Sequence, residues 1–282
     1  MSVETGSRRH VPQWNGAGSF SLRRVSALVL RYAYLLLGSW ARVLELAYWP
    51  SVQIILWGFI AKNFSGHTTG GAGIAGALLA AVLLWDILFR GQLGYTVSFL
   101  EELWSRNLGQ LFISPLRPYE MVLSLTTISL IRALIGVCPA ILIAIPLYGF
   151  SLFDLGLPLV GFFANLMVTG WALGLFVTAL LLRVGLGAES VAWMALFLIA
   201  PVSAIYYPVH VLPVWLQWVA WSLPPAYVFE GMRAILFNGV FRGDLLVGAV
   251  LLNVLYFILG GLTFTFSFRM ARRQGYLHQL GE

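Results

Sequence analysis

The sequence SFLEELWSRNLGQLFISPLRPYE, residues 98–120, is a charged segment between two long apolar stretches. Its apolar positions recur at helical spacing, which predicts one apolar face of a short helix whose other face is charged. These positions are Leu100, Leu103, Trp104, Leu108 and Leu111. Pro115 is expected to end this helix. Such a helix can lie along a membrane surface and be bound by a partner protein; the alternative is a solvated loop that only connects two spans.

The overall composition predicts an integral membrane protein. Of the 282 residues, 60% are hydrophobic and 10% are charged, and the mean hydropathy is +0.86. This leaves too few polar side chains to cover a soluble globule. Because about 20 apolar residues in a helix cross a bilayer core, and the apolar stretches have that length, we expect an all-α membrane protein and not a barrel. The single cysteine, Cys138, excludes a disulfide within the chain.

Six membrane spans are expected, with other elements before and between them. The spans cover about residues 43–61, 74–97, 119–148, 158–182, 190–207 and 244–268. Residues 1–20 are expected to form a loose cytoplasmic tail. In residues 21–42 arginines interleave with apolar residues, which predicts an amphipathic helix in the headgroup layer, unless its second half begins the first span. Residues 208–243 are apolar but interrupted by prolines, which predicts two short re-entrant helices in the outer leaflet.

The distribution of basic residues predicts the orientation. With six spans, both termini lie on one side of the membrane. Of the 17 lysines and arginines, only Lys62, Arg233 and Arg242 fall on the opposite side, whereas Arg90 and Arg132 fall within spans. Because positive charge collects in cytoplasmic loops, both termini are expected in the cytoplasm of a cell with the protein in its inner membrane. The positive net charge therefore has a topological explanation, and nucleic acid is not an expected partner.

Three segments together resemble the permease subunits of ABC-2 type exporters. They are the basic N-terminal helix, the glutamate-bearing segment that ends in Ser114-Pro115-Leu116, and PVSAIYYPVHVLPVWLQWVAWSLPPAYVFEGMR at residues 201–233. The resemblance covers about residues 21–270, within a transmembrane domain assigned to residues 21–282. It implies a six-span subunit that pairs with a second permease subunit, a homodimer being expected. It also implies that residues 98–118, as a cytoplasmic coupling helix, dock on an ATP-binding cassette subunit.

The resemblance implies export of a hydrophobic, amphiphilic or lipid-linked cargo, which includes glycans. The chain contains no G-x-x-x-x-G-K-[ST] phosphate-binding loop. ATP and Mg²⁺ are therefore expected on a separate ATPase chain, and this chain is expected to be a transport subunit without enzyme activity, cofactor or metal. Membrane lipid is the remaining expected partner.

Two groups of residues are assigned to coupling and transport. A rigid charged helix end can enter a groove and transmit its movement, although its charges could also be only solvated. The residues expected to contact the ATPase are Phe99, Glu101, Glu102, Trp104 and Arg106. In the family, spans 1, 2 and 5 face the dimer axis, which implies an aromatic substrate pathway, with ordinary packing as the alternative. The pathway residues are Tyr48, Trp49, Trp57, Trp85 and Trp193.

For the ionisable residues outside these groups, a structural role is expected before a role in transport. Asp86 and Arg132 lie well within spans 2 and 3, and an ion pair between them would relieve the cost of both charges. Asp86 could instead pair with Arg90, its i+4 neighbour. As a further alternative, either Asp86 or Arg132 could line the substrate path. In the outer block, an outer gate or a structural lock is expected, and the sequence does not separate the two. Its residues are Tyr206, Tyr207, Glu230 and Arg233.

Two other classes of protein fit less well. An intramembrane enzyme needs clustered catalytic groups at the depth of the reaction, but the four histidines lie in tails or loops. An ion-coupled secondary transporter often has repeated halves and ionisable groups near the midplane. Here no repeat is evident, and only Asp86 and Arg132 qualify. ATP-dependent as opposed to gradient-driven release of substrate discriminates between the transporter classes.

Overall fold

The computed structural model describes residues 20–67, 71–114 and 116–274, and every regular element in that part of the chain is helical. The predicted tail, residues 1–20, lies outside the described residues except for Phe20. The α-helices are α1 Leu22–Leu37, α2 Trp40–His67, α3 Gly71–Trp104, α4 Leu108–Ile113, α5 Pro118–Tyr148, α6 Pro158–Val184, α7 Glu189–Ile199, α8 Val214–Trp221, α9 Pro224–Asn238 and α10 Gly243–Gln274. Short 3-10 helices are η1 Leu152–Leu155, η2 Gly185–Ala188 and η3 Val209–Val211.

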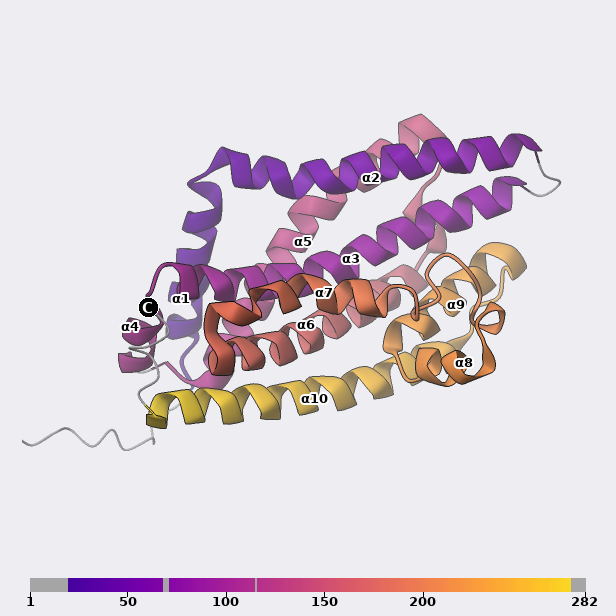
Figure 1. The fold of residues 1–282 in the computed structure, drawn as a ribbon. Coiled ribbons are helices and arrows are strands. Elements are labelled where there is room, and N and C mark those ends of the chain that lie inside the picture. The colour runs from indigo at the N-terminus through magenta and orange to yellow at the C-terminus, as the bar shows by residue number, and fades with distance from the viewer. Residues whose placement is uncertain (1–19, 68–70, 115, 275–282) are drawn as a thin grey trace, which may run out of the picture.

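The long helices form an elongated bundle, with short elements at its two ends (Figure 1). Helix α1 crosses one end, where α4 and the end of α10 also lie, and α8 and α9 cover the other end. Helix α6 packs against α3 and against α10, and α5 and α2 both pack against α3. The end with α1 corresponds to the side predicted to be cytoplasmic, and the end with α8 and α9 to the outer side.

Five segments of the described chain are long and apolar enough to cross a membrane. They are Trp40–Asn63, Gly73–Trp104, Pro118–Tyr148, Pro158–Ile199 and Gly243–Arg272. The fourth contains both α6 and α7, but α7 folds back beside α6 after η2 (Figure 1). The predicted fifth span, residues 190–207, is helical only to Ile199, because Pro201 cannot continue the helix and turns follow it. Six spans are therefore not confirmed.

The charged segment at residues 98–118 does not form one surface helix, contrary to the prediction. Helix α3 continues to Trp104, and the chain then turns sharply before the six-residue helix α4. The turn is a Schellman motif. The N–H of Asn107 donates to the carbonyl of Glu102, and the N–H of Arg106 donates to that of Leu103. Arg106 has a left-handed φ of 53°, a conformation that glycine adopts without strain.

Helix α1 is a separate element, because Gly38 and Ser39 divide it from α2. Of the segment 21–42, only residues 40–42 belong to the first span, which begins with α2. One face of α1 is buried, mainly against α5. The buried residues on that face are Val25, Leu28, Tyr32 and Leu36. The opposite face also exposes large apolar side chains, among them Leu30 and Tyr34. Its position in the headgroup layer remains a prediction.

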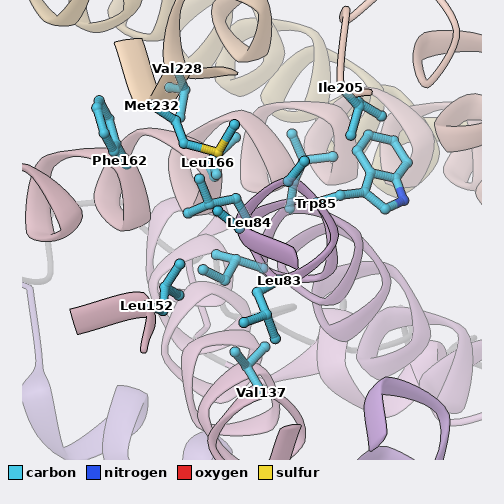
Figure 2. Packing of buried hydrophobic residues seen from close by; sticks show 14 of the residues in the cluster. Leu83, Leu84, Trp85, Val137, Leu152, Phe162, Leu166, Ile205, Val228 and Met232 are labelled. Atoms are coloured by element: carbon cyan, nitrogen blue, oxygen red, sulfur yellow. The ribbon is translucent and has the colours of Figure 1, made fainter. Parts of the chain in front are cut away.

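The main hydrophobic core lies where α3 and α5 meet α6 and α9. Figure 2 shows Leu83 and Leu84 of α3 pointing between the neighbouring helices, with Phe162 and Met232 close by. Trp85 belongs to this core and lies beside Ile205 (Figure 2). Residues 208–243 contain η3, α8 and α9, so two short helices are present there. Their re-entrant placement stays a prediction.

Candidate functional site: a polar cavity and its surroundings

A cavity of about 560 Å³ opens between α2, α3, α5 and α7. Its polar lining residues are Arg42, Glu45, Gln53, Asp86, Arg90, Glu101 and Arg132, and its aromatic ones are Trp49, Phe89, Trp104 and Trp193. Asp86 and Glu101 are both on α3, and their spacing corresponds to about 22 Å along the helix axis. The cavity therefore extends from the middle of the second span to the end that carries α1 and α4.

Two ion pairs lie in the wall of this cavity. Within α3, the Arg90 Nε donates to Asp86 Oδ2 at 2.8 Å, and the two side chains are only 8% and 6% exposed. Arg132 of α5 donates through Nη2 to Glu101 of α3 at 2.9 Å. The expected Asp86–Arg132 pair is not formed, because each of these charges has a closer partner. The structure instead has the i+4 pair that the sequence offered for Asp86.

The aromatic residues predicted to form a pathway occupy different environments. Trp49 and Trp193 line the cavity. Tyr48 does not line it, but contacts Trp49 edge to face at 5.5 Å between ring centroids. Trp57 stacks on Tyr206 at 4.9 Å, which ties α2 to the outer segment. Trp85 does not line the cavity and packs in the hydrophobic core, as the alternative of ordinary packing has it, and its role in a pathway stays a prediction.

A network of arginine and glutamate side chains joins α1 to the bundle. Arg24 donates to Glu120 at 2.6 Å, and Glu120 also accepts the backbone N–H groups of Ser21 and Arg117. The hydrogen bond to Glu120 raises the pKa of the Arg24 guanidinium. Arg31 donates to Glu102 at 2.9 Å. Glu120 thus holds the start of α5 to the start of α1, because the same carboxylate caps α5 through the N–H of Arg117 and forms an ion pair with Arg24 of α1.

The residues predicted to contact an ATPase are divided between interior and surface. Phe99 and Glu102 are fully buried, and Glu101 is 12% exposed in its side chain. Glu102 accepts from Arg31 and from Asn107, and Glu101 from Arg132, so these carboxylates hold the protein together. The alternative of mere solvation does not apply to them here, because arginines from other helices bind them, and their contact with an ATPase stays a prediction. Trp104 and Arg106 are exposed, and Trp104 donates to Glu189 of α7.

A second polar cluster, here called the outer lock, ties α9 to the turns after α7. Arg233 donates to the carbonyls of Ala204 and Ile205 at 2.9 and 3.2 Å and to Glu230 at 3.2 Å. Glu230 accepts the N–H of Val209 at 2.6 Å. Ala204 has a left-handed φ of 52°, so Arg233 holds a strained turn. Burial lowers the pKa of Arg233, an effect that Glu230 opposes.

The two tyrosines assigned to the outer block lie at the same end. The Tyr207 hydroxyl donates to the carbonyl of Pro201. The ring of Tyr206 stacks on Trp57, so this residue brings the turn after α7 into contact with α2. The Tyr207 contact closes the segment after α7 on itself, whereas the Tyr206 contact, like those of Arg233, fastens that segment to a neighbouring helix. The geometry therefore favours a structural lock over an open gate in this conformation.

The sequence interpretation gave no cavity role to four polar lining residues, although a signal was present. Arg42, Glu45 and Gln53 of α2 lie on the same stripe as Trp49, at spacings of three or four residues. Arg90 stands one turn from Asp86 on α3. Polar residues at helical spacing on an otherwise apolar span indicate a face that does not contact lipid.

The turn at Arg106 yields a prediction about stability. Arg106→Gly should raise the thermal midpoint, because glycine adopts the left-handed φ without the cost of about 1 kcal/mol that other residues incur. Arg106→Ala removes the same charge and keeps the strain, so it should give no such gain. Thermal unfolding of both variants in one detergent checks this. A gain in both would mean that the charge, not the backbone, is responsible.

Comparison with known families accords with this architecture. The model of the ABC-2 type transporter family matches residues 29–237, which is most of the chain. The chain belongs to the ABC-2 type transporter family, so the resemblance seen in the sequence is confirmed. It is a multi-pass membrane protein of a transport family whose members normally work with an ATPase partner. No curated protein matches the chain significantly.

Proposed function

We propose that this chain is the permease subunit of an ATP-binding cassette exporter. It moves a hydrophobic, amphiphilic or lipid-linked cargo, glycan-bearing lipids included, outward across the cytoplasmic membrane. A separate ATPase subunit supplies ATP and Mg²⁺, and a second permease copy completes the transporter, with the termini in the cytoplasm. The observation that carries the proposal is the family match together with a cavity that is both polar and aromatic.

The cavity has the properties that transport of an amphiphile requires. Its volume lies within the range of small-molecule pockets. Charged side chains from α2, α3 and α5 line it, and Trp49 of α2 and Trp193 of α7 add aromatic surface. A molecule with a polar head and an apolar tail therefore finds partners for both parts in one place.

Coupling to the ATPase is assigned to the turn between α3 and α4. Arg106 is exposed at this turn, and the neighbouring Asn107 donates to Glu102 at 2.9 Å. Glu102 in turn binds Arg31 of α1, and its neighbour Glu101 binds Arg132 in the cavity. A force applied at the turn thus reaches α1 through Glu102 and the cavity wall through Glu101, because directional hydrogen bonds join both carboxylates to their arginines.

Co-purification from the native membrane in mild detergents tests the proposal. We expect a stoichiometric ATP-binding cassette subunit with the wild-type chain and a marked loss of it with Arg106→Glu. The matched control is Arg242→Glu, which reverses an exposed charge at the opposite end and should leave the ATPase bound. If no ATPase accompanies the wild-type chain in any of several detergents, the exporter loses its energy source and an ion-coupled transporter becomes the better explanation.

A further inference from the structure

The charges on the cavity wall balance one another. Three arginines, Arg42, Arg90 and Arg132, and three carboxylates, Glu45, Asp86 and Glu101, line it. A cavity built to hold a phosphate or a carboxylate has guanidinium groups in excess of acids. The wall of this one has no net charge.

The arginines are also engaged. Arg90 and Asp86 are bonded at 2.8 Å, and Arg132 binds both oxygens of Glu101, at 2.9 and 3.1 Å. Arg42 approaches Glu101 at 3.7 Å. An anion that bound Arg90 or Arg132 would displace a carboxylate, and that carboxylate would be left uncompensated in a largely buried place. A cation that bound Asp86 or Glu101 would displace an arginine at the same cost.

We propose that the cavity binds the head group of an amphiphile that carries no net charge. The inference rests on the proposed transport function and names the cargo class. A head rich in both hydrogen-bond donors and acceptors, whether hydroxyl-rich or zwitterionic, contacts the carboxylates, the guanidiniums and the Gln53 amide while the ion pairs stay closed. The tail lies against Trp49 and Trp193. Net charge of the head is the property that selects the cargo.

Four probes with the same dodecyl tail separate the possibilities. They are dodecyl maltoside (hydroxyl-rich), dodecylphosphocholine (zwitterionic), dodecyl phosphate (anionic) and dodecyltrimethylammonium (cationic). The full chain with Cys138→Ser and Val97→Cys is placed in lipid nanodiscs and labelled at Val97→Cys, on the cavity wall, with an environment-sensitive fluorophore. A label at Leu255→Cys, half-exposed on α10, reports partitioning into the bilayer alone.

We expect saturable binding at the cavity label, at least about tenfold tighter for one or both uncharged heads than for either charged head. The maltoside and phosphocholine arms tell which of the two chemistries is preferred. Tightest binding of dodecyl phosphate or of dodecyltrimethylammonium would overturn the inference and leave the proposed function standing. No saturable signal with any probe would contradict the cavity as the transport site, and with it both proposals.

Charge variants give a second test. Asp86→Asn leaves Arg90 without its carboxylate and should shift the preference toward dodecyl phosphate. Arg90→Gln should shift it toward dodecyltrimethylammonium, and the double variant, whose wall is again balanced, should restore the preference for uncharged heads. Glu45→Gln, at the exposed rim, buries no unpaired charge and tests the same shift if the buried variants fail to fold. An unchanged ranking in Glu45→Gln and the single variants would overturn the inference.

Discussion

Arg233→Ala is expected to lower the free energy of unfolding by about 3 kcal/mol, because it removes the buried arginine of a largely buried ion pair and the donor to two buried carbonyls. Glu230 keeps its charge but loses its guanidinium, and the carbonyls of Ala204 and Ile205 lose their donor. Thermal unfolding of the purified protein measures the loss. Hydrogen exchange should rise first in residues 201–209, the segment that Arg233 holds.

The control for Arg233 is another arginine–carboxylate pair at the same end of the bundle. Arg242 binds Asp244, but these side chains are 52% and 61% exposed, against 10% and 21% for Arg233 and Glu230. Solvent screens an exposed pair, so Arg242→Ala should cost no more than about 1 kcal/mol. Equal losses in the two variants would mean that burial of the outer lock does not determine its strength.

Gly170→Ala is expected to separate α3 from α6. A Cβ atom at residue 170 would lie 2.8 Å from the backbone nitrogen of Gln92 and 2.9 Å from the carbonyl oxygen of Leu88. Backbone atoms cannot rotate away as a side chain does, so the two helices must move apart. We expect a loss of at least about 1–3 kcal/mol, measured as a lower thermal midpoint and a smaller monodisperse fraction on size exclusion.

Gly261→Ala is the matched control for this substitution. Gly261 lies in α10, and a Cβ there meets nothing within 4 Å. Alanine is the better helix former, so Gly261→Ala should be neutral or stabilising by up to about 1 kcal/mol. If both glycines respond alike, helix propensity decides the outcome and the close approach of α3 and α6 does not.

Much of the fold could be predicted from hydropathy, because lipid requires long apolar helices. The third span was expected at residues 119–148, and α5 runs from Pro118 to Tyr148. The second was ended near residue 97, whereas α3 continues to Trp104, since Glu101 and Glu102 look like a loop in sequence. Their partners, Arg132 and Arg31, come from other helices, and the sequence does not show which helices meet.

The candidate site could be predicted in part, where its contacts are local. The i+4 pair of Asp86 and Arg90 follows from helix geometry, and the outer cluster of Glu230 and Arg233 from their spacing of three. The pairing of Arg132 with Glu101 depends on how α5 packs against α3, which periodicity does not determine. The same limit applies to Trp85, which packs in the core beside Ile205 (Figure 2), a residue far from it in the sequence.

Helix α3 contains no proline, whereas α2 is interrupted by Pro50 and α5 by Pro139 and Pro146. It is therefore a stiff lever about 50 Å long, with the Arg106 turn at one end. A tilt of about 5° around its outer end would shift Glu101 by about 4 Å and Asp86 by about half as much, given the helical rise. Glu101 binds Arg132 of α5 at 2.9 Å, so a shift of this size would break that ion pair, whereas Asp86 and Arg90 lie on the same helix and would move together.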